Sequence, residues 1–211
     1  MKKYILLDWD GNLARTLDIW LDACHIAINN QGIQKTDEEI AASFGQFTKY
    51  LTEWGISDVN AAIEDADKVA KKQLPEVELY PDAAAVLETL KEQGKKLALI
   101  TTSPHENIQH LLEKHGLGSM FDVIVAGDDV ENHKPHPEPL DTAIEQLGGN
   151  KEDSIMIGDS DKDLGASENA GVDSILFYPP EHERFYSLES LKSHNPTYVV
   201  SDFKDVIDIV N

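Results

Sequence analysis

The 211-residue sequence has very little cysteine and few basic residues, and each shortage excludes a class of protein. Cys24 is the only cysteine, so an internal disulfide and a zinc site built from several cysteines are both excluded. Lys and Arg total 18 against 39 Asp and Glu, which gives a formal net charge of −21. Because such a surface repels nucleic acid phosphates and anionic lipid headgroups, we expect neither nucleic acid nor membrane as a partner.

Long apolar runs and the P-loop pattern are also missing. No apolar stretch approaches the length of a membrane-spanning helix, and Asp8 interrupts the N-terminal apolar run too early for a signal-peptide core. We therefore expect a cytoplasmic protein. The absence of Gly-x-x-x-x-Gly-Lys-Ser/Thr argues against a P-loop nucleotide triphosphatase. The remaining composition, 41% hydrophobic and 27% charged, is typical of a folded globular chain.

Short apolar runs alternate with helical patterns over most of the chain. Runs of four or five apolar residues without polar alternation predict strands that are buried on both faces. They occupy residues 4–7, 97–100, 123–126, 154–157 and 174–177. Helices are predicted at 83–93, 104–115, 137–147 and 161–170, and a helix, a short strand at 197–200 and a closing helix follow residue 185. This alternation predicts an α/β fold, a parallel sheet with helices on both faces.

The chain between the first two strands predicts a separate helical domain. Three amphipathic segments lie there, and none resembles a strand. The first runs from Leu17 to about Gly32, the second opens with a capping box at 36–39 and continues to Leu51, and the third covers residues 57 to about 74. We interpret residues 1–14 and 81–211 as the core and residues 15–80 as an inserted helical cap.

Two aspartates directly follow the first strand. In open parallel sheets, ligands bind beyond the carboxyl ends of the strands. Asp8 and Asp10 are two residues apart, so an extended chain directs both carboxylates to the same side. Mg²⁺ binds to such carboxylates together with phosphate oxygens, and a carboxylate can attack phosphorus to give an acyl phosphate. Taken alone, the segment fits an Asp-Gly turn better than a catalytic pair.

Hydroxyl residues follow the second strand. Ser103 is expected to be the N-cap of the next helix, with Pro104 at its first position and Glu106 completing a capping box. The hydroxyls of Thr101 and Thr102 are then near a helix N-terminus, where free N–H groups and the helix dipole favour an anion such as phosphate.

A lysine follows the third strand. The ammonium of Lys134, which precedes Pro135, could neutralise a phosphate and restrain Asp8, although a single lysine is usually solvated. His133 and His136 raise the alternative of a histidine metal site, which the lack of cysteine and of a helical His-x-x-x-His pair disfavours.

A second acidic cluster follows the fourth strand. The segment 158–163 reads Gly-Asp-Ser-Asp-Lys-Asp and directly precedes a helix. A calcium loop would need a regular ligand series ending in Glu, which is absent. A helix cap accounts for one aspartate, whereas Asp159 and Asp163 are further candidates for metal binding.

The order of these motifs resembles that of the haloacid dehalogenase superfamily. Paired Asp residues come first, then a Thr, then Lys-Pro, then Gly-Asp-x-x-x-Asp, over nearly the whole chain. The resemblance is specifically to phosphatases with a helical cap, such as phosphoglycolate phosphatase and β-phosphoglucomutase-like enzymes. It implies a Rossmann-like three-layer core with strand order 5-4-1-2-3, and a mobile cap.

The resemblance also implies a reaction and residue roles. It implies a Mg²⁺-dependent phosphatase that hydrolyses a small phosphorylated metabolite through an aspartyl phosphate. Asp8 would be the nucleophile, and Asp10 would protonate the leaving oxygen and later deprotonate water.

The remaining motif residues would bind the metal and the phosphate. Mg²⁺ would be held by the Asp8 carboxylate, the Asp10 backbone carbonyl and Asp159, with support from Asp163. The phosphoryl oxygens would be bound by Thr101, Thr102 and Lys134.

Alternatives stay open at this stage. Asn12, Arg15 and Thr102 depart from residues common in the family, and Arg15 could alter substrate preference. A sugar-phosphate mutase of the β-phosphoglucomutase type would need a second phosphate site in the cap. A dehalogenase is disfavoured because Asp10 suits phosphoryl chemistry. A receiver-type signalling switch is disfavoured by motif order and chain length.

Overall fold

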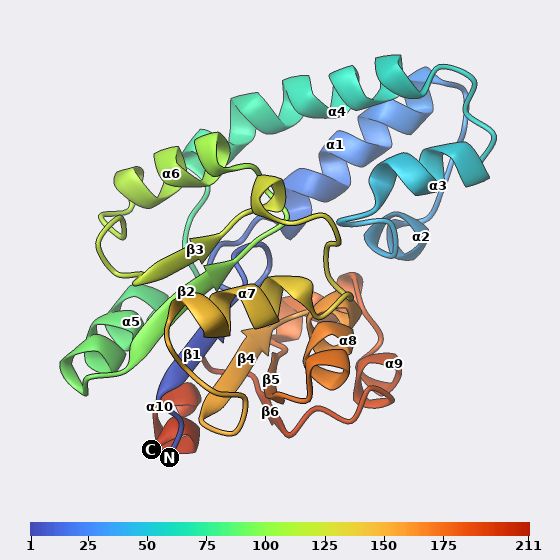
Figure 1. Ribbon diagram of the computed structural model, residues 1–211. Helices are drawn as coiled ribbons and strands as arrows, with labels where there is room; N and C mark the ends of the chain where they lie inside the picture. The colour runs from blue at the N-terminus through green and yellow to red at the C-terminus, as the bar shows by residue number, and fades with distance from the viewer.

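The computed structural model describes all 211 residues and contains one six-stranded parallel sheet (Figure 1). The sheet order is β3-β2-β1-β4-β5-β6. The strands are β1 (Tyr4–Leu7), β2 (Lys96–Ile100), β3 (Val123–Val125), β4 (Ser154–Gly158), β5 (Asp173–Phe177) and β6 (Tyr198–Val200). The predicted parallel sheet is confirmed. The expected order 5-4-1-2-3 describes the first five strands but omits β6, which extends the sheet beyond β5.

Ten α-helices surround or adjoin this sheet. They are α1 (Leu17–Asn30), α2 (Asp37–Ala41), α3 (Phe47–Glu53), α4 (Val59–Gln73), α5 (Ala83–Glu92), α6 (His105–Lys114), α7 (Glu138–Gln146), α8 (Asp161–Ala170), α9 (Leu188–Lys192) and α10 (Asp205–Val210). Short 3₁₀ turns occur at η1 (Leu74–Glu76), η2 (Gly127–Asp129) and η3 (Pro180–Arg184). No helix combines the length and the apolar character needed to cross a membrane.

Both faces of the sheet are buried except at the edge strand β6, which explains the continuous apolar sequences of the inner strands. Ile5 and Leu7 of β1 pack on one face with the apolar sides of α5, α6 and α10. Leu6 points to the opposite face, where it packs with α7 and α8. The three-layer arrangement therefore follows from the period of two along each strand.

The helices α1 to α4, which we call the helical lobe (residues 17–73), have an apolar core of their own that includes Leu21, Ile28 and Leu51. The lobe lies at the end of the sheet opposite to the two termini (Figure 1). The chain enters and leaves it through adjacent segments, since Ala14 and Leu79 form an antiparallel bridge. A domain division at residues 15 and 80 stays a prediction.

One helical prediction inside the lobe is wrong. The second amphipathic segment is not one helix but two, α2 and α3, although its capping box at Thr36 and Glu39 is present. The hydroxyl of Ser43 donates to the carbonyl of Ile40 at 2.6 Å, and Gly45 has a φ of +73°. Because both features favour a turn over a helix, the helix is interrupted between Ala41 and Phe47.

The segment after β5 contacts the lobe through Arg184 and Phe185. Phe185 is buried in the core of the lobe. Arg184 donates from Nη1 to Asp18 Oδ1 at 2.6 Å and from Nε to Asp37 Oδ2 at 3.0 Å. The lobe is therefore held over the carboxyl ends of the strands by contacts from residues 184 and 185.

Candidate active site

A buried lysine joins two aspartates at the carboxyl ends of the strands. Lys134 Nζ donates to Asp8 Oδ1 at 2.7 Å, to Asp163 Oδ1 at 2.6 Å and to the Ile100 carbonyl at 3.3 Å. The exposed fraction is 6% for both Lys134 and Asp8, and 1% for Asp163. The structure thus brings together three of the predicted site residues, which come from distant parts of the sequence.

The charges of this group shift its pKa values. Burial, followed by the charge of Asp163, raises the pKa of Asp8 to about 8, against the opposing effect of Lys134. Burial lowers the pKa of Lys134, but the attraction of Asp163 and Asp8 outweighs it and holds that pKa above its ordinary value. One ammonium neutralises only one of the two carboxylates, and this excess of acidic groups favours either a bound proton or a further cation.

Asp159 adds a further carboxylate to this excess. Its side chain is 1% exposed, and its Oδ2 atom has no hydrogen-bond partner. Burial, and then the charges of Asp163 and Asp8, raise the pKa of Asp159 well above its ordinary value. A buried carboxylate without a partner is costly, so this oxygen is suited to bind a cation.

The geometry around Asp159 fits Mg²⁺. Ligand oxygens of Asp8, Asp159 and Asp163 all lie within 4.8 Å of one another. A Cβ atom at Gly11, where φ is +73°, would overlap Asp159 Oδ2, so that only glycine leaves room beside this oxygen. An all-oxygen set of carboxylates is the set that Mg²⁺ prefers.

Asp163 supports this group and has no free oxygen. It is the third residue of α8, and its Oδ2 accepts from Ser160 N at 3.2 Å and from Ser160 Oγ at 2.7 Å. Its Oδ1 accepts from Lys134. The predicted metal residue Asp163 therefore holds the lysine and the N-terminus of α8 in the structure.

Asp10 lies beside the helical lobe. Trp20 of α1 donates from Nε1 to Asp10 Oδ1 at 2.8 Å. Burial raises the pKa of Asp10, and the Trp20 indole and the Thr16 hydroxyl oppose that rise. The Thr16 hydroxyl is close to Asp10, but Oγ1 makes no hydrogen bond of ordinary geometry.

The two predicted threonines differ in their surroundings. Thr101 is buried, and its Oγ1 accepts from the backbone N–H of Ser103 at 3.1 Å. Thr102 is exposed and lines the cleft. The structure therefore places Thr102 at the cleft surface and Thr101 just beneath it, with its hydroxyl turned to the backbone.

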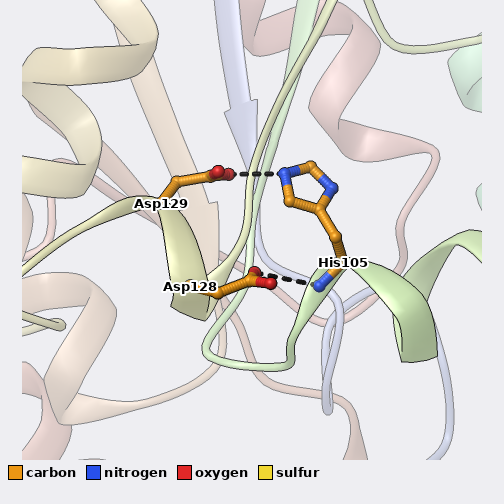
Figure 2. A group of neighbouring side chains, drawn as sticks. All are labelled: His105, Asp128 and Asp129. Carbon is orange, nitrogen blue, oxygen red and sulfur yellow. Dashed lines mark hydrogen bonds and ion pairs between the residues drawn. The ribbon is translucent and has the colours of Figure 1, made fainter.

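The prediction that Ser103 caps the next helix is wrong. Helix α6 begins at His105, after an extended Pro104, and Ser103 makes no capping bond. The N–H of His105 donates instead to Asp128 Oδ1 at 3.0 Å, and His105 Nε2 contacts Asp129 Oδ2 at 2.6 Å (Figure 2). Because the capping carboxylate comes from η2, the local sequence could not identify it.

A cleft of about 430 Å³ lies above these groups, between the sheet and the lobe. Asp8, Asp10, Lys134 and Asp159 line its polar part. Aromatic residues line other parts of it, namely Trp20, Phe44, Phe47 and Tyr186. The site can therefore hold a charged group next to the carboxylates and an uncharged group against the aromatic walls.

Sequence reasoning missed several residues of this cleft. Trp20 lies in the first predicted amphipathic segment, and its indole N–H gave no sequence signal. Lys162 also lines the cleft, where it pairs with Asp161 at 2.8 Å and donates to the Ala42 carbonyl at 3.2 Å. These contacts depend on how the lobe meets the sheet, which no local pattern encodes.

Comparisons with known proteins agree with this geometry. The family described as "Haloacid dehalogenase-like hydrolase" matches residues 5–177. The chain is 42% identical over 135 residues to Pyrophosphatase PpaX of Halalkalibacterium halodurans, a match that covers 64% of this chain and 60% of that relative. A Pyrophosphatase PpaX of Bacillus cereus strain G9842 is 26% identical over 212 residues, which covers 98% of this chain and 95% of the relative.

A solved structure has the same overall fold. A crystal structure from Bacteroides fragilis, described as a haloacid dehalogenase-like hydrolase, superimposes with a TM-score of 0.85 at 25% sequence identity. The superposition covers 98% of this chain and 100% of that one. The fold that the two proteins share therefore includes both the sheet and the helical lobe.

Proposed function

This chain belongs to the haloacid dehalogenase-like hydrolase family, as the motif order predicted, and we propose that it is a Mg²⁺-dependent phosphatase acting through an aspartyl phosphate at Asp8. The observation that carries the proposal is the buried group of Asp8, Lys134 and Asp159, in which one carboxylate oxygen lacks a partner. Phosphoryl transfer needs in-line positioning and neutralisation of charge, and these residues supply both.

In the first step, a carboxylate oxygen of Asp8 attacks phosphorus. The hydrogen bond from Lys134 occupies Oδ1, so the other oxygen, Oδ2, is free to form the new bond. The bond between phosphorus and the leaving oxygen breaks, and Asp10 gives its proton to that oxygen. A magnesium ion held by Asp8, the Asp10 carbonyl and Asp159 would offset the charge of the phosphoryl group.

In the second step, water hydrolyses the aspartyl phosphate. Asp10, now ionised, takes a proton from the water, whose oxygen attacks phosphorus. The bond between Asp8 and phosphorus breaks, which releases inorganic phosphate and restores both carboxyl groups. Thr102, at the cleft surface, and Lys134 would bind the phosphoryl oxygens, and Thr101 would fix the loop between them.

We propose an organic phosphate monoester as the substrate. Aromatic side chains line the part of the cleft that would receive the leaving group. The curated relatives are named pyrophosphatases, so pyrophosphate is the second candidate. Its second phosphoryl group would need a further cation, and Lys162, the other lysine of the cleft, already pairs with Asp161. A single phosphoryl group therefore fits the charges better.

A panel of phosphate esters and pyrophosphate, assayed with and without Mg²⁺, tests the proposal. We expect Mg²⁺-dependent release of phosphate by the wild type and none above background by Asp8→Asn. Asp205→Asn, which changes an exposed aspartate of α10, is the matched control and should keep full activity. Hydrolysis that survives Asp8→Asn would remove the nucleophile, and phosphate that is returned to a sugar would indicate the mutase. A cytoplasmic location stays a prediction.

A further inference from the structure

We propose that Trp20 is a positioning residue for Asp10, and that its indole N–H orients the carboxyl group that transfers the proton to the leaving group. This inference rests on the proposed function, because it assigns to Asp10 the role of general acid and base. Trp20 belongs to the lobe and Asp10 to the loop after β1, and a hydrogen bond of 2.8 Å joins them. Both side chains line the cleft.

The bond from Trp20 is the one hydrogen bond of ordinary geometry that the Asp10 carboxylate accepts in the structure. The Thr16 hydroxyl lies near Asp10 but makes no such bond. The orientation of the carboxyl group therefore depends on the indole. A proton transfer requires the two heavy atoms within hydrogen-bond reach, and a small misplacement of the acid has a large effect on rate.

The chemistry of the indole adds a second constraint. An indole N–H can donate but cannot accept a hydrogen bond. When Asp10 is protonated, Oδ1 therefore stays the acceptor of the Trp20 bond and the proton resides on Oδ2. The contact thus selects which oxygen of Asp10 serves the leaving group.

The position of Trp20 depends on how the lobe is held. Trp20 belongs to α1. The same helix is joined to the core by Arg184, which donates a hydrogen bond to Asp18 at 2.6 Å. Lys162 of α8 donates to the Ala42 carbonyl of the lobe at 3.2 Å. A displacement of the lobe that breaks these contacts would also withdraw the indole from Asp10, because a hydrogen bond weakens steeply beyond its ordinary length.

The test is Trp20→Phe, which keeps an aromatic ring in the cleft wall and removes the N–H. Its matched control is Trp54→Phe, a tryptophan of the same lobe that packs on Phe47 and Tyr50 and contacts no catalytic group. The substrates are phenyl phosphate and para-nitrophenyl phosphate, which are nearly alike in shape but differ in the basicity of the leaving phenol. kcat/KM is measured with Mg²⁺, because it reports the steps up to departure of that phenol.

Only the more basic leaving group needs a proton from Asp10. We expect Trp20→Phe to lower kcat/KM by about tenfold or more with phenyl phosphate and by less than about threefold with para-nitrophenyl phosphate. Trp54→Phe should lower neither selectively. Equal losses on both esters would assign Trp20 to packing or substrate binding and would overturn the proposal.

A double-mutant cycle with Asp10→Asn gives an independent readout. We expect Trp20→Phe to have no further effect on kcat/KM once Asp10→Asn has removed the general acid. An unchanged fold effect in that background would also overturn the proposal. If the wild type instead shows no Mg²⁺-dependent hydrolysis of either ester, the proposed function fails. Failure of this inference alone is distinguished from that result, because the wild type then hydrolyses both esters and Trp20→Phe lowers kcat/KM equally for the two.

Discussion

Replacing Lys134 by Met should destabilise the metal-free protein strongly. The ammonium is 6% exposed and bonds to Asp8 at 2.7 Å and to Asp163 at 2.6 Å. Met fills a similar volume but leaves both carboxylates buried without a counter-charge. Removing one partner of a buried ion pair costs about 3–5 kcal/mol. In a chain of this length, that loss lowers the melting temperature by about 10 °C.

Thermal denaturation followed by circular dichroism, in buffer with a chelator, measures this effect. Lys151→Met is the control, since its side chain is 49% exposed and pairs with Asp141 at 2.8 Å. An exposed pair contributes about 0–1 kcal/mol, so the control should melt close to the wild type. Adding Asp163→Asn to Lys134→Met removes one of the two orphaned charges and should recover part of the loss.

Mg²⁺ should reduce the difference in melting temperature between Lys134→Met and the wild type, because the cation offsets the charge of the carboxylates that Lys134 neutralises. A Lys134→Met protein that melts with the control in the absence of metal would refute the reasoning. The buried lysine would then contribute no more than a surface residue.

Two further predictions concern the pH dependence of stability and the glycine beside the proposed metal site. Burial lowers the pKa of His182 to about 3, and unfolding returns it to about 6.5, so the unfolded state takes up a proton first as pH falls. The contribution of His182 to stability should therefore fall by about 2 kcal/mol between pH 7.5 and pH 5. Urea denaturation measures it as the difference in unfolding free energy between the wild type and His182→Gln, because the raised pKa of Asp8 acts in the opposite direction in both proteins. A difference that is the same at both pH values would contradict this cause. Gly11→Ala should weaken Mg²⁺ binding by about tenfold or more, because the new Cβ would overlap Asp159 Oδ2. Calorimetric titration measures the affinity, and Gly118→Ala, which meets open space, should bind Mg²⁺ as the wild type does.

Elements with a strong local pattern could be predicted from the sequence. The apolar run of β1 has the bounds 4–7 that the sequence predicts, and β2 and β5 differ by one residue at their starts. Their side chains are buried on both faces, so composition alone marks them. The acidic residues at strand ends could be identified because a parallel sheet collects the carboxyl ends of its strands at one edge.

Contacts between distant elements could not be predicted. The capping of α6 comes from Asp128, 23 residues away from His105, and not from the adjacent Ser103. Phe185 is an apolar residue after β5, and nothing in its neighbourhood assigns it to the core of the lobe. The bond from Trp20 to Asp10 likewise depends on how the lobe sits on the sheet.

Phosphorylation of Asp8 itself is the most direct test of the proposed mechanism. The Asp10→Asn protein, incubated with Mg²⁺ and para-nitrophenyl phosphate, should form the aspartyl phosphate but hydrolyse it slowly, because the base for the second step is missing. After an acid quench, peptide mass spectrometry should find one added phosphoryl group on Asp8, and none in a protein that also carries Asp8→Asn. A phosphoryl group on another residue, or hydrolysis without any phosphorylated peptide, would contradict the mechanism.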